Sequence, residues 1–88
     1  MVSRKFDIVF SPTSRRVYDE IKDKKLLRGI NRTLDKISED PFQFPKLSGV
    51  LEGLRKAKTF SYRIVFRIVE SEIQVYVFAI GPRADIYR

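Results

Sequence analysis

The 88-residue sequence contains neither cysteine nor histidine. Without cysteine the chain forms no disulfides and no zinc or iron–sulfur site built on thiolates. Without histidine it lacks the most common metal ligand and the usual general base near neutral pH. The acids are scattered among basic neighbours and form no carboxylate cluster for magnesium. We therefore expect no metal site and no small-molecule cofactor, and the usual serine, cysteine and metal-dependent hydrolase schemes lose their central residue.

Long apolar runs are also missing. Residues 1–10 contain no apolar stretch followed by a cleavage pattern, and no segment reaches the length of a membrane span. We therefore expect a cytoplasmic protein with no membrane association. The length predicts a single domain, residues 1–88, with one compact core and one functional surface.

Positive charge is the most prominent feature of the composition. Lysine and arginine total 18 against 11 acids, which gives a net charge of +7. A field of this sign attracts polyanions and speeds their encounter with the protein. Nucleic acid is the leading partner class on this ground. An acidic protein or an anionic membrane surface remains an alternative, and so does a basic domain that binds no RNA.

The first half of the sequence predicts one strand and two helices. Apolar residues alternate with other residues over 5–10, which is typical of a strand with one buried face. Ser11-Pro12 predicts a helix start, because serine caps free N–H groups and proline needs no donor there. A polar turn is expected at residues 23–25. The second helix ends at Asp40-Pro41, and its apolar stripe comprises Leu27, Ile30, Leu34 and Ile37.

The second half predicts three strands, over residues 54–60, 62–70 and 73–80, with Gly81-Pro82 ending the last one. The strand at 73–80 is apolar on both faces, as expected for a central strand. The predicted order is therefore β-α-α-β-β-β. This order indicates a small α+β domain in which a helical hairpin packs on a curved antiparallel sheet.

Basic residues gather in this second half. Lys56 and Lys58 point the same way because they stand two residues apart on a strand. Arg63 and Arg67 share one face of the next strand, so antiparallel pairing would bring all four cations together. Arg83 would join them if the last strand returns alongside. Clustered cations repel one another, which favours an anionic ligand, although Arg67 alone is better explained by a solvated position.

Several motifs together resemble the RelE/ParE superfamily of toxin–antitoxin toxins. The segment Gly53-Leu54-Arg55-Lys56-Ala57-Lys58, followed by Tyr62-Arg63-Ile64-Val65-Phe66, is similar to the family's pattern of Gly-Leu, two spaced basic residues and Tyr-Arg. The ending Gly81-Pro82-Arg83-Ala84-Asp85-Ile86-Tyr87-Arg88 is similar to its closing Arg…Tyr segment. Phe60-Ser61 stands where relatives have Gly-Asp in the turn. The resemblance covers most of the chain and implies a type II toxin.

The superfamily contains two activities. RelE-like members cut mRNA in the ribosomal decoding site with the 2′-hydroxyl of the RNA as nucleophile, whereas ParE-like members inhibit DNA gyrase. Five positions match the RelE-like catalytic set: Lys56, Lys58, Arg63, Arg83 and Tyr87. This match favours a ribosome-dependent mRNA endoribonuclease that inhibits translation. A gyrase inhibitor and a non-catalytic RNA-binding protein of the same fold remain alternatives.

The resemblance also implies roles and partners. Arg63 and Arg83 would stabilise charge on the phosphoryl oxygens, and a lysine of the 56/58 pair is the candidate general base. Tyr87 would orient the nucleophile or stack on a base, unless it only packs the end of the chain. General RNA binding is assigned to Arg55, Arg67 and Arg88. The expected partners are a RelB-like cognate antitoxin, the ribosome and mRNA.

Overall fold

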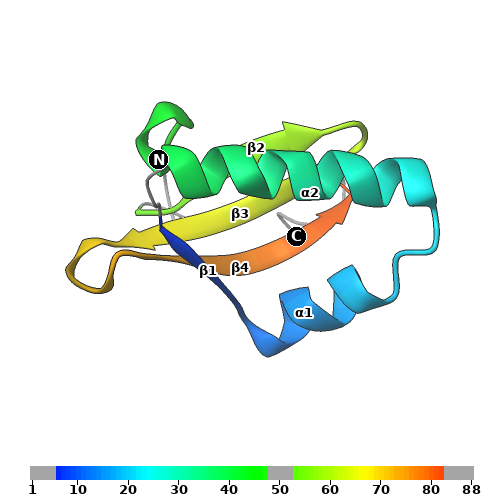
Figure 1. Ribbon diagram of the computed structural model, residues 1–88, viewed down its shortest axis with the longest axis horizontal. Coiled ribbons are helices and arrows are strands. Elements are labelled where there is room, and N and C mark those ends of the chain that lie inside the picture. Colours follow the sequence, from blue (N-terminus) through cyan, green and yellow to red (C-terminus); the bar gives the residue numbers. More distant parts are fainter. Residues whose placement is uncertain (1–5, 48–52, 83–88) are drawn as a thin grey trace.

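The computed structural model describes residues 6–47 and 53–82 (Figure 1). The elements follow in the order β1 (Asp7–Phe10), α1 (Pro12–Asp19), α2 (Lys24–Glu39), β2 (Arg55–Thr59), β3 (Tyr62–Val69) and β4 (Gln74–Pro82). Two short 3-10 turns lie between them, η1 (Pro41–Gln43) and η3 (Glu70–Glu72). The α+β class and the β-α-α-β-β-β order expected from the sequence are confirmed.

Two predicted boundaries differ from the structure. The predicted turn at residues 23–25 is wrong, because the Asp23 carboxylate accepts hydrogen bonds from the backbone N–H groups of Lys25 (2.9 Å) and Leu26 (3.1 Å). Asp23 therefore caps α2, and the helix begins at Lys24. Gly81 and Pro82 do not follow the last strand but are its final two residues, since β4 runs to Pro82 and both residues pair with the start of β3.

The sheet has four strands in the order β1-β4-β3-β2. The expected antiparallel sheet comprises β2, β3 and β4, and β1 adds a parallel strand beside β4, from Asp7 opposite Gln74 to Phe10 opposite Val77. The sheet is therefore mixed. The parallel pairing is possible because the two helices carry the chain away before it returns. As expected from its apolar composition, β4 is a central strand.

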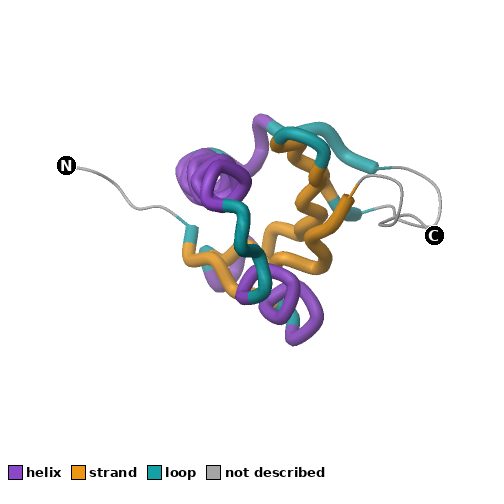
Figure 2. Tube along the Cα trace, turned by 90° about the vertical axis from the view of Figure 1, so that its right-hand side faces the viewer, coloured by secondary structure: helices purple, strands orange, loops and turns teal. Residues whose placement is uncertain are grey.

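The core lies between α2 and one face of the sheet. The helix contributes Ile30, Leu34 and Ile37, three members of the predicted stripe, and the strands contribute Ala57, Ile64, Phe66, Val75, Val77 and Ile80. Full burial of one such aliphatic or aromatic side chain stabilises a fold by about 1.5–3 kcal/mol. Figure 1 shows α2 running across the sheet, and Figure 2 shows α2 nearly end-on beside the strands. No helix in the described part of the chain is long and apolar enough to cross a membrane.

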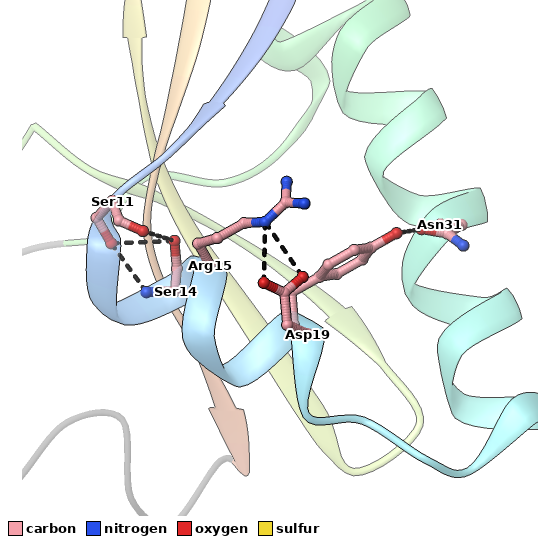
Figure 3. Close-up of polar contacts among 6 residues, drawn as sticks. Ser11, Ser14, Arg15, Asp19 and Asn31 are labelled. Carbon is pink, nitrogen blue, oxygen red and sulfur yellow. Dashed lines mark hydrogen bonds and ion pairs between the residues drawn. The ribbon is translucent and has the colours of Figure 1, made fainter.

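Two serines join α1 to β4 where β1 ends, and Figure 3 shows the contacts between these serines at the start of α1. The Ser11 Oγ accepts a hydrogen bond from the Ser14 backbone N–H at 3.1 Å and so caps α1. The fully buried Ser14 Oγ donates to the Val77 carbonyl at 3.0 Å, and the Ser11 Oγ lies 3.0 Å from the Phe78 carbonyl. Hydroxyl groups thus bind two carbonyls of β4, one opposite the last residue of β1 and one just beyond it.

The β2–β3 hairpin turns at Phe60-Ser61. Phe60 adopts a left-handed conformation (φ 55°), which costs a non-glycine residue about 1 kcal/mol or more. Its ring lies over α2 at Gly29, where an added Cβ would stand 2.5 Å from the Phe60 Cε2 atom. The absence of a side chain at Gly29 is therefore what allows the phenylalanine of the turn to contact the helix.

Candidate functional site

The predicted basic cluster lies on the sheet surface that faces away from α2. In the β2–β3 ladder, Lys58 pairs with Arg63 and Lys56 with Val65, while Ala57 pairs with Ile64 in the core. Directly paired residues project to the same face, so both lysines and Arg63 project away from the helix. We call this surface the outer face; its described residues include Val9, Lys56, Lys58, Arg63, Val65, Arg67, Tyr76, Phe78 and Ala79.

The register arranges the outer face in rows across the strands. One row runs from Lys58 through Arg63 to Gly81, and the next from Lys56 through Val65 to Ala79. Rows two residues apart along a strand are separated by roughly 6.7 Å. Since glycine carries no side chain, Lys58 and Arg63 are the two functional groups of the first row. The expected gathering of Lys56, Lys58 and Arg63 on one face is confirmed.

The charged residues of β2, β3 and β4 on the outer face are all basic, whereas the edge strand β1 brings an exposed acid, Asp7, to the same face. The strands β2, β3 and β4 contain no aspartate or glutamate. Lys58 and Arg67 are exposed and Lys56 is half-buried, whereas the Arg63 side chain is only 7% exposed. Burial holds the planar guanidinium of Arg63 in one place, a geometry suited to bidentate contact with phosphate oxygens. Within residues 6–47 and 53–82, no cluster of acids is placed to hold a metal ion.

Arg55 lies apart from the other predicted site residues. It pairs with Phe66, whose ring belongs to the core, so Arg55 stands on the helix side of β2. Its Nη1 donates to the carbonyl of Phe44 at 2.7 Å and to that of Phe42 at 3.4 Å. The guanidinium carbon also lies 5.5 Å from the Phe42 ring centroid. These contacts tie Arg55 to the loop after α2, and its role in RNA binding stays a prediction.

Three predicted site residues fall outside the described part of the chain. They are Arg83 and Tyr87 of the proposed catalytic set and Arg88 of the proposed RNA-binding set. Their roles stay predictions. Arg67 is described, and it lies exposed on the outer face opposite Tyr76 of β4.

The outer face also carries two aromatic residues that are absent from the predicted set. Tyr76 follows from strand alternation, since its neighbours Val75 and Val77 are buried. Phe78 lies two residues after Tyr76 and so shares its face, and a β-bulge then interrupts the register: Val65 pairs with Ala79 and Phe66 with Val77, which leaves Phe78 as the additional residue and brings Ala79 to the same face. An apolar run such as 73–80 gives no local signal for the position of a bulge.

Comparison with known proteins supports the resemblance drawn from the motifs. A family model described as the ParE toxin of the type II toxin–antitoxin system parDE matches residues 8–87. The toxin RelG of Mycobacterium tuberculosis is 27% identical over 84 residues, which cover 94% of this chain and 97% of RelG. These matches run through the strands that carry the basic cluster and extend over nearly the whole chain.

Solved toxin–antitoxin complexes share the fold. The RelBE2 complex of Mycobacterium tuberculosis aligns with a TM-score of 0.78 at 21% identity, covering 91% of this chain and all of the matched chain. The intact RelBE complex of Escherichia coli aligns with a TM-score of 0.75 at 20% identity. This alignment covers 88% of this chain and 95% of the matched chain. With the family model spanning most of the sequence, the chain belongs to the RelE/ParE superfamily and is a toxin of a type II toxin–antitoxin system.

Proposed function

We propose that this toxin is a ribosome-dependent mRNA endoribonuclease that acts in the cytoplasm and inhibits translation. The observation that carries the proposal is the direct pairing of Lys58 with Arg63 on the outer face, with Lys56 on the same side of β2. This arrangement sets amine groups beside a buried guanidinium on a face whose strands β2 to β4 hold no acid. Such a site fits a phosphodiester, which is anionic and gains charge as it reacts.

The proposed reaction needs neither metal nor histidine. The 2′-oxygen of one nucleotide forms a bond to the adjacent phosphorus as the bond from phosphorus to the 5′-oxygen breaks. A base takes the 2′-hydroxyl proton and an acid protonates the leaving 5′-oxygen. The products are a 2′,3′-cyclic phosphate and a 5′-hydroxyl end. Arg63 would stabilise the phosphoryl oxygens, and a lysine of the 56/58 pair would take the proton.

Two residues near the C-terminal end, Arg83 and Tyr87, would complete the proposed site. Arg83 would share the developing negative charge with Arg63, and Tyr87 would orient the nucleophile or stack on a neighbouring base. The similarity to RelE structures supports this proposal through the shared fold. The ribosome would align the mRNA, so cleavage of free RNA should be weak. A RelB-like antitoxin, as present in the similar RelBE complexes, is the proposed partner that keeps the toxin inactive.

A second candidate function is inhibition of DNA gyrase. The matching family model, whose description names a ParE toxin, favours this alternative. In that case the basic outer face would bind a protein–DNA complex without cutting a bond. The presence of lysines at 56 and 58 and of Arg63 on one face supports the endoribonuclease instead, because a binding inhibitor has no need for amines beside a buried guanidinium.

One experiment separates the two functions. The purified toxin is incubated with ribosomes programmed with a defined mRNA, with the same mRNA free in solution, and with gyrase and supercoiled DNA. We expect internal cleavage on the ribosome, 5′-hydroxyl and cyclic phosphate ends, and unchanged gyrase activity. Gyrase–DNA adducts together with intact ribosomal mRNA would contradict the proposal and support the ParE-like alternative.

A further inference from the structure

Phe78 is an exposed aromatic residue in the centre of the outer face. Its side chain is 50% exposed, although β4 is an interior strand of the sheet. The bulge places it beside Ala79, in the row that also contains Lys56 and Val65. A single exposed apolar side chain is unremarkable by itself, but a group of them marks an interaction surface. Whether Phe78 belongs to an interaction surface therefore depends on the residues around it.

Two further side chains extend this apolar surface. Tyr76 stands two residues before Phe78 and is half-buried, and Val9 of β1 pairs with Tyr76 and is 36% exposed. Together they make an open strip on the side of the outer face away from the Lys58–Arg63 row. The strip is wide enough for flat groups to lie on, because the row of Tyr76 and the row of Ala79 stand side by side on the sheet.

Cations border this strip. Arg67 is exposed and pairs directly with Tyr76, and Lys56 lies in the row of Ala79. No acid lies on β2, β3 or β4. Asp7 of β1 shares this face but stands one row beyond Val9, on the side away from Phe78, so the charge around Phe78 suits an anionic occupant. The apolar strip suits flat apolar groups, and the cations at its border suit regularly spaced negative charges, so we expect one ligand that carries both. A single-stranded nucleic acid has these two properties, with bases that stack and phosphates that pair with cations.

We propose that Phe78, with Tyr76 beside it, is a stacking surface for unpaired bases of the RNA strand whose phosphates lie along Arg67 and Lys56. This proposal rests on the proposed function, since it concerns the strand that the toxin would cut. The surface lies next to the Lys58–Arg63 row and is separate from it. It would hold the nucleotides flanking the scissile bond and so set where along the strand the phosphate meets Arg63.

The test uses a short single-stranded RNA that carries the fluorescent base 2-aminopurine, whose emission falls when the base stacks. We expect the wild-type protein to bind and quench it. Phe78→Ala and Phe78→Leu should each lose at least about five-fold in affinity and most of the quenching, whereas Phe78→Tyr should retain both. Phe42→Ala is the matched control, because Phe42 is similarly exposed (47%) but packs near Phe6, away from the outer face.

Three results would overturn the proposal. The first is an absence of quenching by the wild-type protein, and the second is full affinity and quenching by Phe78→Leu, which would mean that any apolar side chain suffices. The third is unchanged RNA binding by Phe78→Ala with weaker binding of the antitoxin, which would make this a protein-docking surface. Cleavage of mRNA on programmed ribosomes distinguishes failure of the stacking surface from failure of the proposed function. If the wild-type toxin cuts mRNA and the Phe78→Ala variant cuts it equally well, only the stacking surface is contradicted. If the wild-type toxin does not cut mRNA, the proposed function is contradicted.

Discussion

Lys58 and Arg63 stand directly opposite each other in the β2–β3 ladder, both on the outer face of the sheet. Only a two-residue turn separates the two strands, so the pairing is fixed by local geometry and does not depend on distant parts of the chain. The exposed amine and the buried guanidinium differ in freedom: Lys58 can move toward a substrate, whereas Arg63 is held in place. We therefore expect Arg63 to act through the fixed geometry of its guanidinium and Lys58 to act through its mobile amine.

The first prediction concerns the shape of Arg63. We expect Arg63→Lys to retain the fold, checked by circular dichroism, but to lower the rate of mRNA cleavage on ribosomes at least about ten-fold. A lysine keeps the charge and cannot make the paired, planar contacts of a guanidinium. The rate is measured with the variant in excess over programmed ribosomes. A folded Arg63→Lys variant with the wild-type rate would mean that charge alone suffices at this position.

The second prediction assigns a structural role to Arg55. Its guanidinium donates to the Phe44 carbonyl and stacks on Phe42, so Arg55→Ala should lower the free energy of unfolding by about 1–2 kcal/mol. Urea denaturation measures this change. Arg67→Ala is the matched control, since it removes an exposed cation of the same sheet and should leave stability within about 0.5 kcal/mol. Equal stability of the two variants would contradict the assignment.

Most of the fold follows from the sequence because its signals are local. Ser11-Pro12, Asp40-Pro41 and the alternation in residues 62–70 each predict the element that the structure contains. The parallel pairing of β1 with β4 could not be predicted in this way, since it joins segments more than sixty residues apart along the chain and depends on how the helices pack. Asp23 was ambiguous, because aspartate favours both turns and helix caps.

The candidate site was predictable to the same extent. Alternation and a short hairpin are enough to place Lys56, Lys58 and Arg63 on one face. They do not show that Arg55 faces the opposite way and binds loop carbonyls, because its partners lie eleven and thirteen residues earlier in the sequence. Phe78 escaped prediction for a different reason: residues 73–80 are almost all apolar, so their sequence does not show which side chains face away from the helix, and the bulge that follows Val77 arises only from the pairing of two strands.

The third prediction tests the serine link between α1 and β4. Ser14→Ala removes the hydroxyl that donates to the Val77 carbonyl inside the protein, and we expect a loss of about 1–2 kcal/mol in the free energy of unfolding. Thermal or urea unfolding measures the loss. Thr13→Ala, at the exposed neighbouring position of the same helical turn, serves as the control and should change stability little. A stability of Ser14→Ala equal to that of the control would show that the link contributes nothing.

The fourth prediction concerns the contact of Phe60 with Gly29. Alanine normally stabilises a helix interior by about 1 kcal/mol relative to glycine. Here Gly29→Ala should instead destabilise the protein, because the new Cβ would meet the Phe60 ring and the Thr59 Oγ1 at 2.5 and 2.8 Å. Unfolding measurements on both single variants and the double variant form a double-mutant cycle. In a Phe60→Ala background the penalty should shrink; strict additivity would contradict a direct contact.

The central claim is that the outer face of the sheet cuts mRNA, and it is tested most directly by removing Lys58. Cleavage of ribosome-bound mRNA is measured for the wild type, for Lys58→Ala, and for Arg32→Ala, which removes one exposed cation from α2 and so changes the net charge equally. We expect Lys58→Ala to lower the rate about 100-fold or more, and Arg32→Ala to stay within about two-fold of the wild type. Equal rates for the two variants would contradict the account.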